Sequence, residues 1–189
     1  LLRSAVRDDN PVIVLEHRWL YDIHGEVDDA LRIPLGPPAV RRRGDAVTVV
    51  ATSWMVVEAL KAAEVLARQG VELEVIDVRT IAPLQDGPIH ESVRRTRRCL
   101  IVDYDWTFCG FSAELAARVG AACFPELAHP VERLGFAHVP CPTTRPLESL
   151  FYPSAKEIIR TVERMLGMAP TDLSEEQFYT YEQRFKGPF

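Results

Sequence analysis

Short apolar runs alternate with amphipathic stretches along most of this chain, and this alternation constrains its fold more than any other feature. The runs predict buried strands over residues 47–51, 73–78, 99–103 and 130–134. Strands with apolar side chains on both faces are typical of parallel sheets that are covered by helices. Right-handed crossover connections then give a three-layer α/β fold, with a mostly parallel sheet and helices on both faces.

The stretches between these runs predict helices over residues 54–69, 89–97, 112–124 and 155–166. We expect Thr52 or Ser53 to be the N-cap of the first helix and Ser154 the N-cap of the last. A further apolar run over residues 11–16 follows a polar turn and predicts another buried strand.

Residues 19–44 show no periodicity and contain several prolines and glycines, which predicts an extended connection between two domains. The chain starts without Met and without a cap before Leu1, so we expect it to be a fragment of a longer protein. Aromatic residues gather near its C-terminus, where they could cover the domain's own surface or bind a partner subunit. They are Phe178, Tyr179, Tyr181, Phe185 and Phe189.

Charge and composition exclude some partners. A net charge of −5 argues against nucleic acid as the main partner. The apolar runs are far shorter than the roughly 20 residues that span a bilayer, so we expect no membrane segment. None of the four cysteines forms a Cys-x-x-Cys pair. We expect Cys99 and Cys123 to be core thiols in a reducing compartment, the cytoplasm of a bacterium.

Motifs for common chemistries are missing. The sequence has no phosphate-binding loop, dinucleotide-binding turn or nucleophile elbow, and its histidines are not at metal-ligand spacing. Thiamine diphosphate needs a magnesium–diphosphate cradle, signalled by Gly-Asp-Gly and a later Asn, and a glutamate that activates the cofactor. Gly44-Asp45-Ala46 departs from the cradle motif at its third residue. We therefore expect a turn there, and no cofactor bound by this chain alone.

Several segments, taken in order, nevertheless resemble one known family. Residues 1–21 look like the end of a pyrimidine-binding domain. The later segments are Ile33-Pro-Leu-Gly36, Val75-Ile-Asp-Val-Arg-Thr-Ile-Ala-Pro-Leu84, Gly110-Phe-Ser-Ala-Glu-Leu-Ala-Ala117, Val139-Pro-Cys-Pro142, Leu147-Glu148 and Tyr152-Pro153. Together they are similar, colinearly over about residues 1–167, to β subunits of thiamine-diphosphate-dependent pyruvate and branched-chain 2-oxoacid dehydrogenases.

The resemblance implies four parts: a remnant of the pyrimidine-binding domain (1–21), a linker (22–45), a transketolase C-terminal-like domain (46–167) and an aromatic tail (168–189). It implies an enzyme that decarboxylates a 2-oxoacid and passes the acyl group to lipoamide. Within such an enzyme the C-terminal domain serves assembly and frames the substrate channel.

The implied partners are an α subunit or thiamine-diphosphate-binding domain, a second copy of the chain in a homodimer, and a lipoyl-bearing acyltransferase core. Thiamine diphosphate and magnesium belong to the full assembly. The family's cofactor glutamate and cation-site residues lie upstream of Leu1, so no catalytic, cofactor-binding or metal residue carries over to this chain.

Four residues are candidates for the channel or an interface: Arg79, Asp103, Gly110 and His138. Arg79 and Asp103 lie at the ends of predicted parallel strands, and the carboxyl ends of such strands are where ligands bind in open α/β sheets. They could instead pair with neighbours in the chain or face a partner subunit. Gly110 precedes a helix whose N–H groups could hold an anion, or it forms a tight turn. His138 lies in a proline-flanked loop that could face a shared cleft.

Alternatives remain open. The chain could be a non-catalytic assembly or regulatory module, or part of a related transketolase-like enzyme with another acceptor. The family often has His-Glu near Asp103-Tyr104 and a glycine in place of Ser112, so this sequence departs from its pattern. An independent small-molecule-binding domain is disfavoured by the colinear resemblance. The basic clusters at residues 41–43 and 94–98 fit either solvated faces or subunit contacts.

Overall fold

The computed structural model describes residues 1–28, 30–176 and 178, and its centre is a five-stranded sheet of order β1-β3-β2-β4-β5. The strands are β1 (Ala39–Arg42), β2 (Val47–Ala51), β3 (Leu73–Asp77), β4 (Cys99–Trp106) and β5 (Glu132–Phe136). β2 to β5 are parallel, and β1 pairs antiparallel with β3 at one edge. The α/β class and the mostly parallel sheet are confirmed.

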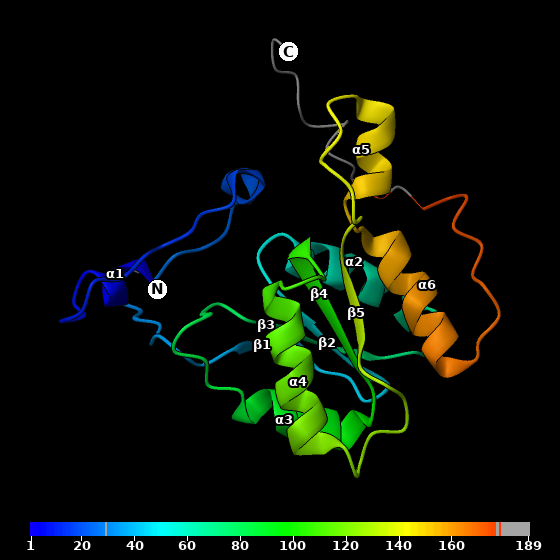
Figure 1. Cartoon of the computed structure of the whole chain (residues 1–189), viewed down its shortest axis with the longest axis horizontal. Coiled ribbons are helices and arrows are strands. Elements are labelled where there is room, and N and C mark those ends of the chain that lie inside the picture. Colours follow the sequence, from blue (N-terminus) through cyan, green and yellow to red (C-terminus); the bar gives the residue numbers. More distant parts are fainter. Residues whose placement is uncertain (29, 177, 179–189) are drawn as a thin grey trace.

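Helices cover both faces of this sheet, which confirms the three-layer arrangement (Figure 1). One face packs against α2 (Met55–Ala67) and α6 (Ala155–Leu166). The other packs against α3 (Gly87–Thr96) and α4 (Phe111–Cys123). β2 lies in the middle of the sheet and is buried at every residue, as its apolar run predicts. The described residues also form three short helices: α1 (Leu2–Ala5), η1 (Arg18–Asp22) and α5 (Arg145–Phe151).

The start of α6 is fixed as its sequence predicts. The Ser154 hydroxyl accepts the backbone N–H of Lys156, and the Glu157 carboxylate accepts the backbone N–H of Ser154 at 2.9 Å, which forms a reciprocal capping box. Gly167 ends the helix with φ +66°, a conformation that glycine adopts without cost.

Other local predictions are wrong. Neither Thr52 nor Ser53 caps α2: the N-cap is Trp54, while the Thr52 hydroxyl donates to Asp103. Residues 11–16 form no strand. Ile13 and Leu15 are 86% and 82% exposed. A strand needs a neighbour that accepts its backbone hydrogen bonds, and no described strand lies beside this run.

β1 and α5 were not predicted. β1 lies within the segment that the sequence suggests is a linker, and it carries two arginines in only four residues. Those arginines explain its position, because Arg41 pairs with Asp77 and Arg42 pairs with Glu72, on or beside β3.

The arginines of the two basic clusters, residues 41–43 and 94–98, form ion pairs and hydrogen bonds with neighbouring carboxylates and backbone carbonyls. Arg43 and Arg95 both pair with Glu74, a β3 residue that is only 1% exposed. Arg94 and Arg97 donate to the backbone carbonyls of Ala122 and Glu126, just before and after the end of α4. These contacts tie α3 to its neighbours. Subunit contact by the same residues stays a prediction.

Two expectations about single residues are confirmed. Cys99 and Cys123 are buried free thiols in the core between the sheet, α3 and α4. Phe178 packs against the core on the α2–α6 side, so this tail residue covers the domain's own surface. The other tail aromatics, residues 179, 181, 185 and 189, lie outside the described residues. No described helix is long and apolar enough to cross a bilayer.

Candidate functional site

The carboxyl ends of β2, β3, β4 and β5 share one edge of the sheet, because these strands are parallel. Ligands in open α/β sheets bind at this kind of edge. Asp103 lies on β4 just beyond the residue that pairs with Ala51, the last residue of β2. Arg79 follows β3, and His138 follows β5. The predicted candidates therefore lie along one edge, and their contacts decide what each can do.

Asp103 is buried and its carboxylate is used within the chain. One oxygen accepts the Thr52 hydroxyl at 2.6 Å. The other accepts the backbone N–H of Ser112, in the first turn of α4, at 3.1 Å. A carboxylate at a helix N-terminus satisfies an otherwise orphan N–H and complements the helix dipole. Asp103 thus pairs with neighbours, which is the structural alternative that the sequence left open.

Gly110 is a close-approach position rather than an open anion site. A Cβ on Gly110 would lie 2.0 Å from the carbonyl oxygen of Trp106, closer than atoms can pack. The N-terminus of α4 that follows already faces the carboxylate of Asp103. A second anion at this turn would be repelled by that carboxylate, so the tight-turn interpretation holds.

Arg79 and His138 lie toward opposite ends of this edge. The Arg79 guanidinium donates to the Pro37 carbonyl at 3.0 Å, while its Nε and the Thr80 hydroxyl are buried without a hydrogen-bond partner. The His138 ring lies 5.7 Å from that of Phe108 and lines an open pocket of about 440 Å³. β2 and β4 separate β3 from β5, so the edge does not bring Arg79 and His138 together.

An aromatic cluster, which sequence reasoning missed, lies at the same edge. We call it the edge cluster, and its members are His17, Trp19, Trp54, Tyr104, Phe136 and Tyr152. Tyr104 is central: its ring centroid is 4.5 Å from His17, 4.8 Å from Phe136 and 5.4 Å from Tyr152, which stacks on it.

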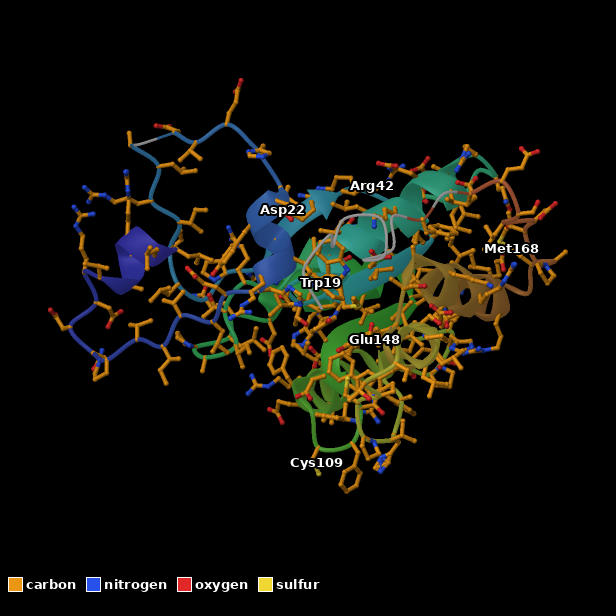
Figure 2. All side chains as sticks on the ribbon, turned by 90° about the horizontal axis from the view of Figure 1, so that it is seen from above. Trp19, Asp22, Arg42, Cys109, Glu148 and Met168 are labelled. Atoms are coloured by element: carbon orange, nitrogen blue, oxygen red, sulfur yellow. The ribbon has the colours of Figure 1, made fainter. Side chains whose placement is uncertain are left out.

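The edge cluster attaches the N-terminal segment to the sheet domain. Figure 2 shows Trp19, on η1, against the body of the domain. Aromatic pairs of this edge-to-face kind contribute roughly 0.5–1.5 kcal/mol each beyond their buried area. A signal was present in the sequence, because Tyr104 and Trp106 share one face at the end of β4. Their partners, however, come from distant segments.

Burial sets the protonation of the edge cluster. It lowers the pKa of His17 from 6.5 and raises the pKa of Tyr104 above its usual value. Burial, followed by a hydrogen bond with Cys141, raises the pKa of Tyr152 to about 12. His17 Nδ1 accepts the backbone N–H of Trp19 at 3.3 Å, which a neutral imidazole can do and an imidazolium cannot. At neutral pH the cluster is therefore uncharged.

We predict that docking of the N-terminal segment weakens as the pH falls below 6.5. Between its lowered folded pKa and 6.5, His17 binds fewer protons in the docked chain than in the undocked chain, so docking weakens with acidification. Quenching of tryptophan fluorescence by acrylamide should increase between about pH 7.5 and about pH 5.5. A His17→Phe variant keeps a ring and should lose this dependence; the same pH response in both proteins would contradict the prediction.

The sequence profile of the family described as "Transketolase, C-terminal domain" matches residues 37–158. The chain belongs to this family. The match spans the sheet from β1 to β5 and the first residues of α6, so it includes the whole carboxyl edge.

Relatives of this transketolase C-terminal domain are named as β subunits. The chain is 40% identical over 166 residues to the pyruvate dehydrogenase E1 component subunit beta of Rickettsia felis, covering 87% of this chain and 51% of that protein. It is 37% identical over 167 residues to the acetoin:2,6-dichlorophenolindophenol oxidoreductase subunit beta of Cupriavidus necator, covering 88% and 49%. The chain thus spans about half the length of these relatives.

A third β subunit and a solved structure are also similar to this chain. The mitochondrial pyruvate dehydrogenase E1 component subunit beta of Pisum sativum is 40% identical over 169 residues, which cover 87% of this chain and 47% of that protein. A solved structure titled "Split gene transketolase, inactive beta4 tetramer" superposes with a TM-score of 0.64 at 23% identity, covering 78% of this chain and 48% of that one. At that identity the likeness shows the fold.

The turn at Gly44 does not fit a magnesium–diphosphate cradle. The backbone N–H groups of Asp45 and Ala46 both donate to the Glu72 carbonyl, at 3.1 and 2.9 Å. A Cβ on Gly44 would lie 2.3 Å from the backbone of Leu73. This transketolase C-terminal domain therefore uses the turn to pack β2 against β3. Within the described part of the chain, no three His, Cys, Asp or Glu side chains are grouped to hold a metal.

Proposed function

We propose that this domain is part of the β component of a thiamine-diphosphate-dependent 2-oxoacid dehydrogenase, which decarboxylates a 2-oxoacid and passes the acyl group to lipoamide. The observation that carries the proposal is the 40% identity over 166 residues to a pyruvate dehydrogenase E1 β subunit. That similarity covers 87% of the chain, which is more than the family match over residues 37–158.

The domain's part in this enzyme is assembly and the framing of the substrate channel. Asp103 and Gly110 contribute to this role indirectly, because both residues hold the start of α4 in place at the carboxyl edge of the sheet. His138 is the candidate that faces outward. His138 is exposed and lines an open pocket, so it has capacity to contact a neighbouring domain, whereas the Arg79 guanidinium binds the Pro37 carbonyl within the chain.

The four-part organisation fits the same proposal. Residues 1–21 are the end of a pyrimidine-binding domain, and the rest of that domain covers the apolar side chains over residues 11–16, which are exposed in this chain. Residues 22–45 connect the two domains, with β1 as the part of this connection that joins the second sheet. Residues 46–167 form the second domain, and residues 168–189 form its tail.

The partners in this assembly are an α subunit or thiamine-diphosphate-binding domain, a second copy of the β chain, and a lipoyl acyltransferase core. Those partners bring thiamine diphosphate and magnesium to the enzyme, since the turn at Gly44 does not fit the cradle. The cytoplasm of a bacterium is the proposed location.

A second candidate is a related enzyme with another electron or acyl acceptor. The relative in Cupriavidus necator, a β subunit named for acetoin and an artificial dye acceptor, is 37% identical over a similar span. Comparing lipoamide with the dye as acceptor, in the assembled enzyme, distinguishes the two candidates.

Calorimetric titration of thiamine diphosphate in the presence of magnesium tests the proposal. We expect no heat of binding with this chain alone. We expect saturable binding when the full-length β protein is mixed with the protein that is encoded by its genomic neighbour and carries the Gly-Asp-Gly motif. Association of the two proteins without cofactor binding would favour a non-catalytic assembly or regulatory module instead.

A further inference from the structure

The linker, residues 22–45, is hydrogen-bonded to the loop that joins β3 to α3 at the carboxyl edge of the sheet. The Arg79 guanidinium, near the start of this loop, donates to the Pro37 carbonyl at 3.0 Å. The backbone N–H of Gln85, near the end of the loop, donates to the Gly36 carbonyl at 3.2 Å. Two neighbouring carbonyls of the linker are therefore bonded to the two ends of one loop. We call these four residues the linker clamp.

The sequence of the linker suits these contacts. Gly36 is buried and has φ +107°, a conformation that residues with a side chain rarely adopt. A Cβ on Gly36 would lie 2.8 Å from Nε2 of Gln85, so glycine lets the linker lie close against the loop. Pro37 and Pro38 have no backbone N–H and offer only carbonyl acceptors. Arginine is a donor without acceptor atoms, which makes it a matching partner for this segment.

Arg79 uses its guanidinium for the linker. Within the part of the chain that the structure describes, the Pro37 carbonyl is the only hydrogen-bond acceptor of this group, and its Nε is buried without a partner. The nearby carboxylate of Asp77 forms an ion pair with Arg41 on β1, at 3.7 Å. Burial raises the pKa of Asp77, and the positive charges of Arg41 and Arg79 oppose this effect. Arg79 thus adds a contact between the linker and the sheet next to the pairing of β1 with β3.

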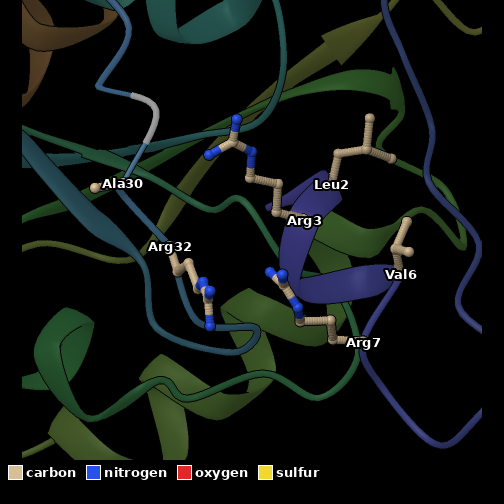
Figure 3. A pocket seen from close by; sticks show the side chains of 6 residues that line it. All are labelled: Leu2, Arg3, Val6, Arg7, Ala30 and Arg32. Carbon is tan, nitrogen blue, oxygen red and sulfur yellow. The ribbon is translucent and has the colours of Figure 1, made fainter.

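The linker is also bonded on the other side of Pro37, to the N-terminal segment. The Ser4 hydroxyl donates to the Ile33 carbonyl at 2.6 Å. Figure 3 shows the linker residues Ala30 and Arg32 beside α1. One short stretch of the linker is therefore bonded both to the N-terminal segment and to the loop at the carboxyl edge.

We propose that Arg79 is a positioning residue, which holds the linker against the loop between β3 and α3 so that this loop and the preceding domain move together. The clamp itself depends on contacts among residues 36–85 only. The positioning of the preceding domain rests on the proposed function, since the assembled enzyme is where that domain is complete.

Amide hydrogen exchange of the 189-residue chain tests the clamp. Arg79→Met keeps a long side chain and removes the donor. The amides of residues 39–42 and of Gln85 should then exchange at least about tenfold faster, because local opening no longer breaks a hydrogen bond from a charged group. Exchange in β2 should not change, which distinguishes the clamp from a general contribution to stability. Arg79→Lys keeps a charged donor and should restore part of the protection.

Arg133→Met is the matched control, because Arg133 also donates to a backbone carbonyl, that of Thr107, beside β5 on the other side of the sheet. It should leave exchange in the linker and at Gln85 unchanged. Gly36→Ala disturbs the clamp from the linker side and should speed exchange of the same amides, so the test does not depend on one variant. Unchanged exchange in Arg79→Met, or equal acceleration in β2, would overturn the proposal.

The assembled enzyme tests the positioning role. Arg79→Met should lower kcat for decarboxylation of the 2-oxoacid more than it raises KM, since Arg79 positions a domain and does not bind substrate. An unchanged kcat together with faster exchange in the linker would overturn this role. If the unmodified assembly shows no decarboxylation, the proposed function fails, and the exchange data still decide the clamp.

Discussion

Replacing Gly110 with alanine should destabilise the fold by at least about 3 kcal/mol, or prevent folding altogether. The added Cβ would lie 2.0 Å from the carbonyl oxygen and 3.2 Å from the carbonyl carbon of Trp106. Both atoms belong to the backbone of β4, so no side-chain rotation relieves the overlap. The turn between β4 and α4 must open, and the bond from Ser112 to Asp103 is lost with it.

Urea unfolding followed by circular dichroism measures this effect, and α4 offers a matched control. Gly120 lies in the same helix, and a Cβ added there would meet no neighbouring segment within 4 Å. Gly120→Ala should raise the free energy of unfolding by about 0.5–1 kcal/mol, as alanine does in a helix interior. Equal effects of the two substitutions would show that Gly110 does not approach Trp106 closely.

Replacing Glu58 with alanine should cost about 3 kcal/mol of stability. Glu58 lies on α2 and is only 5% exposed. Its carboxylate accepts the backbone N–H of Ala155 at 2.9 Å and an N–H of Lys61 at 2.8 Å. The substitution leaves the buried N–H at the first residue of α6 without an acceptor and opens space between the two helices.

The control for this substitution is Glu64→Ala. Glu64 is exposed on the same helix, so its removal should change stability by less than about 0.5 kcal/mol. Glu58→Gln keeps one acceptor oxygen for Ala155 and should fall between the two, at about 1–2 kcal/mol. Thermal unfolding of the three variants measures the order. A Glu58→Ala variant as stable as Glu64→Ala would contradict the role of Glu58 in joining α2 to α6.

The central sheet and its four long helices were predictable because each has a strong local signal. Mostly apolar runs mark β2, β3 and β4, and a serine with glutamate three residues later marks the start of α6. β1 lacks such a signal. It is an edge strand of four residues with two arginines, and it forms because β3 offers backbone partners and acidic side chains.

The run over residues 11–16 is the opposite case. Its β-branched residues carry a strong strand signal, but strand formation depends on a neighbouring strand, which no sequence window contains. Ile13 is consequently almost fully exposed in the described chain. The β-strand propensity of a segment indicates that it can pair with another strand. Whether it forms a strand depends on the presence of that neighbouring strand.

The sequence predicts that the candidate residues lie at the carboxyl edge of the sheet. It does not predict which side chains they contact there. Its candidate residues follow strands, and parallel strands end together. The role of Asp103 depends on Thr52 and Ser112, which are distant in sequence from one another. The edge cluster is harder still to foresee, because its rings come from separate segments of the chain and meet only around Tyr104.

The most direct test of the proposed function is the release of CO2 from a 2-oxoacid by the full-length β protein mixed with its Gly-Asp-Gly-bearing partner. We predict decarboxylation that requires both proteins, thiamine diphosphate and magnesium, with acyl transfer to lipoamide. No CO2 release from pyruvate or branched-chain 2-oxoacids by a demonstrably associated, cofactor-loaded pair would contradict the proposal.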